Sequence, residues 1–146
     1  MKKSNPIYDL YIKHVEGTVI KQKVPNEKVF VGKVNKEAAT GAKLKARKIY
    51  ISARVVKKLY DIRNVENPDE FVYIINNLKK IVVYPDKIYK NKPLKRGSHI
   101  LVRKNRSHYY LCLIQLRPNK KQFEVVTVFP TGLKDSYLDG FNLMWS

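Results

Sequence analysis

Three strand-like runs near the carboxyl end of the sequence constrain the fold more than any other feature. They read "HILVRKN", "HYYLCLIQLR" and "QFEVVTVFPT", they begin at His99, His108 and Gln122, and they are rich in aromatic and β-branched residues. Only "RS" and "PNKK" lie between them. Connections this short join neighbouring antiparallel strands, so the pattern predicts an antiparallel meander.

Two helices are expected before this meander. The first follows Ser52, whose hydroxyl suits an N-cap position. The second starts at "NPDE", where Asn67 is a capping residue and Pro68 fits the first helical position, and it ends before Pro85. The first helix is amphipathic, with an apolar face of Val55, Val56, Leu59 and Tyr60 and an opposite face of Arg54, Lys57 and Lys58.

The predicted fold class is α+β, with two or three helices covering one face of an antiparallel sheet. A chain of 146 residues is expected to form a single domain over 1–146. Within it, residues 48–146 form the core, and residues 1–47 form an extension with one short strand at 28–35. Residues 36–47 are expected to form a loop or a frayed turn. The extension either completes the sheet or serves as an arm on a partner.

The charge of the chain points to its partner. Lys and Arg number 30 against 12 Asp and Glu, which gives a formal net charge of +18. Because 44% of the residues are hydrophobic, this charge belongs to a folded protein and not to a disordered tail. A folded domain this basic is expected to bind a polyanion, and nucleic acid is the first candidate. A membrane surface is disfavoured, because the basic residues do not line one amphipathic helix.

Cysteine usage and apolar runs limit the compartment and the cofactors. The single cysteine, Cys112, excludes an internal disulfide and the usual thiolate set of a zinc site. It lies in the apolar run "YYLCLIQL", which favours a core residue over a nucleophile. With no secretory signal and no run of about 18 apolar residues, a cytoplasmic location is expected. No cofactor and no metal are expected, because the acidic residues that would hold Mg²⁺ are sparse.

Cleavage of RNA without a metal needs a base for the 2′-hydroxyl proton, an acid for the leaving oxygen and a cation beside the phosphate. His108 is the best placed histidine, at the start of a strand and across a short turn from Arg103 and Lys104. A lone histidine at a hairpin end is also a common polar turn residue, so both interpretations stay open. Tyr109 is a candidate for stacking on a base, and strand alternation sends only one of Tyr109 and Tyr110 outward.

The stretch "FEVVTVFPTG" brings two hydroxyls into this basic region. Thr127 interrupts an apolar strand, and a functional hydroxyl and an ordinary strand threonine explain it equally well. Thr131 precedes Gly132 in a predicted turn. Its hydroxyl and the nearby Lys134 are candidate phosphate contacts.

Four segments in a fixed order carry a family resemblance: "YISARVVKKLYDIR", "VYIINNLKKIVVYPDKIYKNK", the two hairpin strands and "FEVVTVFPTGLKDSYL". Together they span about Ile49 to Tyr137 and resemble the phage-associated branch of the barnase, EndoU, colicin and RelE-like nuclease superfamily. The resemblance implies a four-stranded antiparallel sheet with helices on it that binds and cuts RNA without a metal. It further implies functional positions at Lys57 or Arg54 on the helix, Arg103 on the first hairpin strand, and Thr127.

The leading hypothesis is a metal-independent endoribonuclease that acts on tRNA or another structured RNA through attack of the 2′-hydroxyl on its own phosphate. Its candidate catalytic residues are Arg103, His108, Thr127 and Lys57, and its candidate RNA-binding residues are Arg54, Lys58, Lys104, Arg106, Tyr109, Thr131 and Lys134. The alternative is a non-catalytic basic module of a phage or mobile element that binds RNA or DNA, because charge alone supports binding. A toxin held by an acidic antitoxin or immunity protein is compatible with the first hypothesis.

Overall fold

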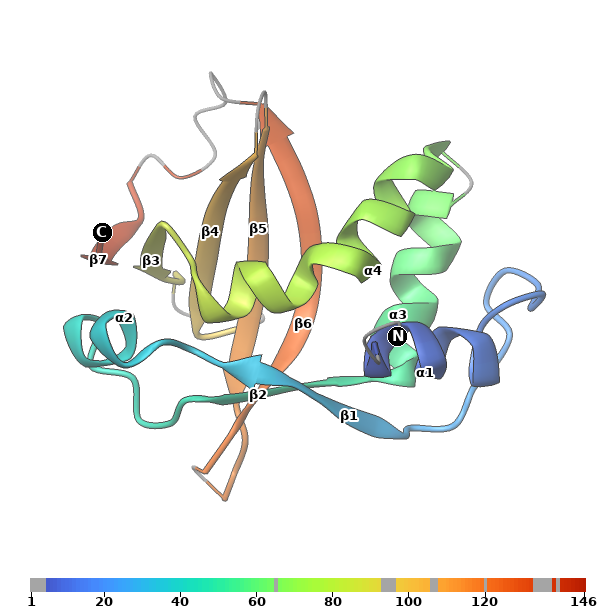
Figure 1. The fold of residues 1–146 in the computed structure, drawn as a ribbon, viewed down its shortest axis with the longest axis horizontal. Helices are drawn as coiled ribbons and strands as arrows, with labels where there is room; N and C mark the ends of the chain where they lie inside the picture. Colours follow the sequence, from blue (N-terminus) through green and yellow to red (C-terminus); the bar gives the residue numbers. More distant parts are fainter. Residues whose placement is uncertain are drawn as a thin grey trace.

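The protein folds as an α+β structure in which helices cover one face of a mixed β-sheet (Figure 1). The computed structural model describes residues 5–64, 66–92, 97–105, 108–119, 121–132, 138 and 140–146. Its helices are α1 (Pro6–His14), α2 (Lys36–Gly41), α3 (Ala53–Leu59) and α4 (Pro68–Val83), and a π-helical turn, η1 (Tyr60–Asn64), follows α3 directly. Its strands are β1 (Lys28–Lys33), β2 (Lys48–Ser52), β3 (Lys87–Lys90), β4 (His99–Asn105), β5 (His108–Leu116), β6 (Phe123–Gly132) and β7 (Asn142–Trp145).

The predicted meander is confirmed. β5 pairs antiparallel with β4 on one side and with β6 on the other, and the observed strands match the three sequence runs closely. The ladders also fix which side chains share a face, since directly paired residues point the same way. Arg103 pairs with Tyr110, whereas Thr127 pairs with Leu113.

The prediction of a four-stranded antiparallel sheet is wrong, because the sheet has seven strands in the order β1-β2-β6-β5-β4-β3-β7. β2 runs parallel to β6, with Ile49 opposite Phe123 and Tyr50 opposite Glu124, and β1 pairs antiparallel with β2. Residues 28–52 therefore complete the sheet. Parallel neighbours require a long connection, and pairing across so many residues leaves no local sequence signal.

The loop predicted over residues 36–47 is also wrong at its start, where α2 forms. The side chain of Asn35 accepts a hydrogen bond from the backbone N–H of Ala38 at 2.9 Å, and its amide donates to the carbonyl of Val83 at 2.8 Å. Ala38 and Ala39 are buried. A helix of six residues has no amphipathic period of its own, so the Asn35 cap, its bonds to the end of α4 and the burial of the two alanines stabilise it.

Both predicted helices are present, with one error in the face assignment. Ser52 caps α3 by accepting from Val55 N–H at 3.2 Å, and Val56 is buried as predicted. Lys57, assigned to the exposed face, is only 4% exposed. The loop that follows α1 lies over this face of α3, and its carbonyl groups provide the polar partner that a buried lysine needs.

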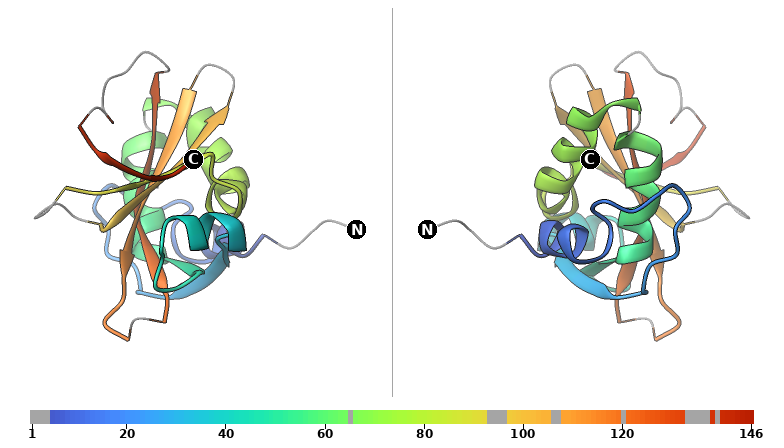
Figure 2. Two further views of the ribbon diagram at one scale, coloured as in Figure 1. Left: turned by 90° about the vertical axis from the view of Figure 1, so that its left-hand side faces the viewer. Right: turned by 90° about the vertical axis from the view of Figure 1, so that its right-hand side faces the viewer.

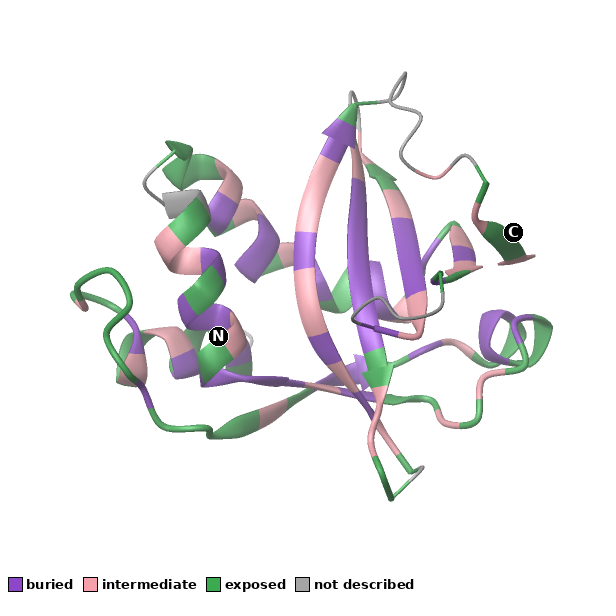
Figure 3. Ribbon diagram, turned by 180° about the vertical axis from the view of Figure 1, so that it is seen from behind, coloured by how far each residue is buried: buried purple, intermediate pink, exposed green. Residues whose placement is uncertain are grey.

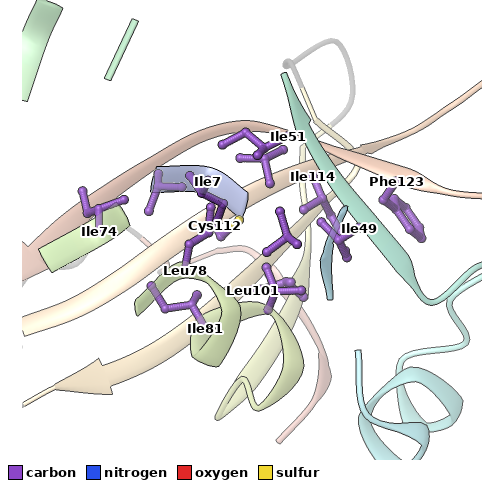
Figure 4. Close-up of a cluster of buried hydrophobic side chains, with 14 of the residues drawn as sticks. Ile7, Ile49, Ile51, Ile74, Leu78, Ile81, Leu101, Cys112, Ile114 and Phe123 are labelled. Atoms are coloured by element: carbon purple, nitrogen blue, oxygen red, sulfur yellow. The ribbon is translucent and has the colours of Figure 1, made fainter. Parts of the chain in front are cut away.

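Apolar side chains pack on both faces of the sheet. The larger cluster lies between the helices and the sheet, where Ile7 of α1 and Leu78 of α4 meet Cys112 of β5 (Figure 4). Side views show α4 along this face (Figure 2). The opposite face, seen from behind in Figure 3, is here called the outer face. Its smaller cluster contains Ile100, Val102, Leu111 and Leu113, with Tyr89, Tyr109, Val126, Phe129, Leu138 and Phe141 packed against them.

Gly41, at the end of α2, lies against the Trp145 side chain of β7, so a substitution at Gly41 tests this packing. A methyl group at this position would overlap Cδ1 of the Trp145 indole, so Gly41→Ala forces the indole to move. Overpacking of this kind typically lowers the free energy of unfolding by about 1–3 kcal/mol, which urea denaturation measures. Gly132→Ala is the control, because nothing lies within 4 Å of a methyl group there. Equal losses in the two variants would contradict this packing.

Candidate nucleic-acid interface

A cleft of about 540 Å³ beside α3 gathers cationic side chains from two separate segments. It lies where the loop between α1 and β1 passes α3 (Figure 1). Five of its eight lining residues are cationic and one is acidic, and we call it the basic cleft. Its lining residues are Lys21, Gln22, Lys23, Val24, Arg54, Lys57, Lys58 and Asp61.

The loop wall of the basic cleft is held in place by hydrogen bonds. Lys21 adopts a left-handed backbone conformation, with φ of 64°, and its N–H donates to Oδ2 of Asp61 at 3.0 Å. The backbone N–H of Val19 donates to the side chain of Gln22 at 3.1 Å. Nε of Arg54 donates to the carbonyl of Val24 at 3.4 Å. The loop and α3 therefore form one rigid pair of walls.

Lys57 lies at the base of the basic cleft in a buried ion pair. Its Nζ lies 2.5 Å from Oδ1 of Asp61 and donates to the carbonyl of Val19 at 2.6 Å. The ammonium also lies 5.6 Å from the centroid of the Tyr60 ring. Both carboxylate oxygens of Asp61 are therefore engaged, one by Lys57 and the other by the backbone of Lys21. The acid in the cleft is neutralised within the protein.

A second group, here called the helix-side cluster, lies on the sheet face that α4 covers, at the β4–β5 hairpin end. Arg103 and His108 belong to it, because strand alternation and pairing put them on the same face as Tyr110. The ring of Tyr110 stacks on Tyr73 of α4 at 4.6 Å between centroids. Burial raises the pKa of Tyr110, and the nearby charge of Glu70 and the Tyr73 ring raise it further. Glu70 lies one turn before Tyr73 on α4, the helix that stacks on Tyr110, and is within electrostatic range of that ring.

The two predicted catalytic residues of the helix-side cluster differ in exposure. His108 is exposed at the start of β5 and Arg103 is half-buried, and the two are diagonal neighbours across the β4–β5 ladder. Diagonal neighbours have Cβ atoms roughly 7–8 Å apart, which is within reach of long side chains. Arg103 also donates from Nη1 to the carbonyl of Tyr84, just after α4, at 2.5 Å. This bond anchors the guanidinium at the hairpin end.

The remaining predicted residues of the sheet lie on the outer face. Thr127 shares the face of Leu113, and Thr131 shares that of Tyr109. Lys104 pairs with Tyr109 and is exposed on the same side, and its N–H donates to Oδ2 of Asp86 at 2.7 Å. Of the predicted residues, the outer face therefore carries two threonine hydroxyls, one lysine and one aromatic ring, and the sheet separates them from the helix-side cluster.

The structure divides the predicted catalytic set among three places. Lys57 lies in the basic cleft, Arg103 and His108 in the helix-side cluster, and Thr127 on the outer face. Of the predicted RNA-binding residues, Arg54 and Lys58 line the basic cleft, whereas Lys104, Tyr109 and Thr131 lie on the outer face. Arg106 and Lys134 lie outside the described residues.

Sequence reasoning missed three residues of these sites. Lys21 and Lys23 lie in the extension, where no periodic pattern indicated a function. Glu70 is not among the predicted site residues, and its proximity to Tyr110 comes from tertiary packing. Only the excess of lysine over acid in residues 18–28 hinted at the first two.

Other titratable groups of the described chain do not form a separate reactive centre. Cys112 is fully buried, and burial raises the pKa of its thiol to about 12, so it is a core residue as predicted. No group of three or more His, Cys, Asp or Glu side chains among the described residues could hold a metal ion. In the same part of the chain no helix is long and apolar enough to cross a membrane.

Comparison of the chain with protein-family models, curated proteins and solved structures found no match in any of the three.

The buried pair in the basic cleft allows a stability test. Asp61→Ala leaves the ammonium of Lys57 buried without its carboxylate, which typically costs about 3–5 kcal/mol of the free energy of unfolding. The double variant Lys57→Met/Asp61→Leu removes both charges and is expected to recover most of that loss. Denaturant unfolding measures both. A double variant as unstable as Asp61→Ala would show that the stability depends on the ion pair itself and not on the cost of an unpaired buried charge.

The partly buried position of His99 predicts that the stability of the protein depends on pH. Burial, followed by the charge of Lys90, lowers the pKa of His99 below its ordinary value of 6.5. The unfolded state therefore binds a proton at a higher pH than the folded state does, and the stability due to neutral His99 is lost as the pH falls below about 6.5. His99→Gln removes this titration, so its free energy of unfolding is expected to fall less than that of the wild type between pH 7 and pH 5.5. Identical pH profiles would contradict the assignment.

Proposed function

We propose that this protein is a metal-independent endoribonuclease that acts on tRNA or another structured RNA at the helix-side cluster. The observation that supports the proposal most is the grouping of Arg103 and His108 on one sheet face with Tyr110, near which Glu70 lies. A carboxylate, an imidazole and a guanidinium are the side chains that metal-free RNA cleavage uses as base, acid and phosphate ligand. The net charge of +18 favours a polyanionic substrate.

Each residue has a definite role in the proposed reaction. Glu70 takes the proton of the 2′-hydroxyl, the 2′-oxygen attacks the adjacent phosphorus, and the bond from phosphorus to the 5′-oxygen of the next nucleotide breaks. Protonated His108 gives its proton to that leaving oxygen, so the products are a 2′,3′-cyclic phosphate and a 5′-hydroxyl. The guanidinium of Arg103 stabilises the negative charge that develops on the phosphate.

The second candidate function is a non-catalytic basic module that binds RNA or DNA. It is favoured by the position of Thr127, which the sheet separates from Arg103, and by the commitment of Lys57 to Asp61. Binding needs only cations facing the phosphates, without a convergent set of reacting groups. An acidic antitoxin or immunity protein would meet the same positive surface and is a compatible partner for either function.

Cleavage assays in EDTA with total tRNA and with an unstructured RNA test the proposal. The wild type is expected to give discrete fragments with cyclic phosphate ends, and His108→Ala and Glu70→Gln are each expected to reduce the rate about 10²–10⁴-fold, as loss of a general acid or base does. Arg103→Ala is expected to be similarly impaired. Thr127→Ala is expected to cut at the wild-type rate, because its side chain lies on the outer face.

Three outcomes would contradict the proposal in different ways. Cleavage of RNA whose 2′-hydroxyl is methylated would exclude the attack by that hydroxyl. Loss of activity in Thr127→Ala with full activity in Arg103→Ala would move the site to the outer face. RNA that stays intact but shifts on a native gel, with an affinity that falls steeply with salt, would establish the binding module.

A further inference from the structure

We infer that the basic cleft is a phosphate-binding site that grips the RNA backbone away from the helix-side cluster. The inference requires that the protein binds RNA, and it does not require that the protein cuts it. No residue of the proposed reaction lines this cleft, which α3 and the loop between α1 and β1 form.

The charge balance inside the cleft is the first support. Five cationic side chains meet one carboxylate, and both oxygens of that carboxylate, Asp61, already accept hydrogen bonds from the protein. An incoming anion therefore meets a net positive wall with little repulsion. Because the donors come from α3 on one side and from the loop on the other, they suit a tetrahedral phosphate better than a planar carboxylate, which a single guanidinium would satisfy.

The rigidity of the cleft is the second support. Lys57, one-twentieth exposed at its side chain, uses two of its three N–H groups on Val19 and Asp61. These two bonds of Lys57 connect the loop to α3 where η1 begins. π-Helical turns such as η1 are uncommon in proteins, and many of those known lie at functional sites. Arg54 and Lys58, one turn apart on α3, remain exposed above this base. The site is held in place before a ligand arrives, which lowers the entropy cost of binding.

Exposed residues next to the cleft lining in the sequence, here called the rim, indicate a large ligand. Val19 and Ile20 on the loop are 69% and 61% exposed, and Ile62, next to Asp61, is 51% exposed. Exposed aliphatic side chains beside a charged cleft mark a surface that contacts a macromolecule. A free phosphate ion would leave them in water, whereas the riboses and bases of an RNA strand would cover them. RNA therefore fits the cleft and its rim together.

Anisotropy titrations of a labelled structured RNA against salt test the inference. Arg54→Gln/Lys58→Gln removes two exposed cations, and if each contacts a phosphate the affinity falls about 10–100-fold. The slope of log K against log salt then shrinks by about 1.4 for a single-stranded contact and about 1.8 for a duplex contact. The matched control is Lys36→Gln/Lys45→Gln, which loses the same charge from exposed positions in and after α2, at the opposite end of the molecule (Figure 1). Its slope is expected to stay near the wild-type value.

A second variant guards against a folding artefact. Nε of Arg54 bonds Val24, so Lys23→Gln/Lys58→Gln removes two cleft cations without touching that bond, and it is expected to give the same change in slope. If the protein cuts RNA, the cleft variants are expected to raise KM with kcat unchanged, whereas the helix-side variants lower kcat. A failure of the phosphate-binding proposal would therefore appear in the salt slope and KM, whereas a failure of the nuclease proposal would appear in kcat.

Competition experiments identify the source of the phosphate. Polyglutamate of equal charge is expected to displace RNA only weakly, and pyrophosphate only at concentrations far above those of RNA. Equal losses of RNA affinity in the cleft and control variants would show that only the overall charge matters, and would overturn the inference. Displacement by polyglutamate as effective as by RNA would indicate an acidic protein partner, and pyrophosphate that binds more tightly than RNA would indicate a small phosphorylated ligand; each would equally overturn it.

Discussion

The parallel pairing of β2 with β6 is the contact on which the rest of the structure depends, because it joins the first third of the chain to the meander. Ile49 and Phe123 face each other across it and are both almost fully buried, and burial of side chains of this size contributes about 1.5–3 kcal/mol each. Glu124 reinforces the junction by binding Lys28 at 2.9 Å and Arg117 at 2.5 Å. α3 starts directly after β2 and also contacts β6, so this pairing helps to place α3 and the basic cleft beside the sheet.

Three of the acidic residues, Glu124, Asp61 and Glu27, are paired with cations of the protein, and this affects how the positive charge is presented. Glu124 binds two cations at the β2–β6 junction, and Asp61 neutralises Lys57. Glu27 accepts from His14 and Lys13, and these hydrogen bonds lower the pKa of its carboxyl. Carboxylates engaged in this way do not oppose phosphates at the surface. The excess cations therefore act on an incoming polyanion with little internal cancellation.

The elements that could be predicted are those whose signals are local. The meander strands follow from alternation and short turns, and α4 follows from Asn67 and Pro68. The parallel β2–β6 pairing, the burial of Lys57 and the small helix α2 depend on contacts between distant segments, which a single sequence does not display. For the same reason the sequence indicated Arg54 and Lys58 as candidate RNA-binding residues but gave no sign of Lys21 and Lys23, which line the same cleft.

The face of Thr127 illustrates how one backbone detail changes a site. In a regular strand Val125 and Thr127 would share a face, and Val125 belongs to the larger hydrophobic cluster between the helices and the sheet. The β5–β6 register shifts between Leu113 and Ile114, so Val126 is an extra residue in β6 and Thr127 turns to the outer face. Such a bulge has no signature in "VVTVF", and a shift of one residue reverses every later side chain.

The outer face is also the less suitable place for RNA. Its aromatic and aliphatic side chains are packed against residues from the carboxyl end of the chain, Leu138 and Phe141 among them, and Nζ of Lys92 lies 4.8 Å from the centroid of the Phe141 ring. A base that stacked on Tyr109 would have to compete with these contacts. At the hairpin end of the helix-covered face His108 is exposed, and in the basic cleft Arg54 and Lys58 are exposed. An RNA that engages both would pass along the helices, so the side of the sheet that holds the main core is also the side on which the substrate is expected to lie.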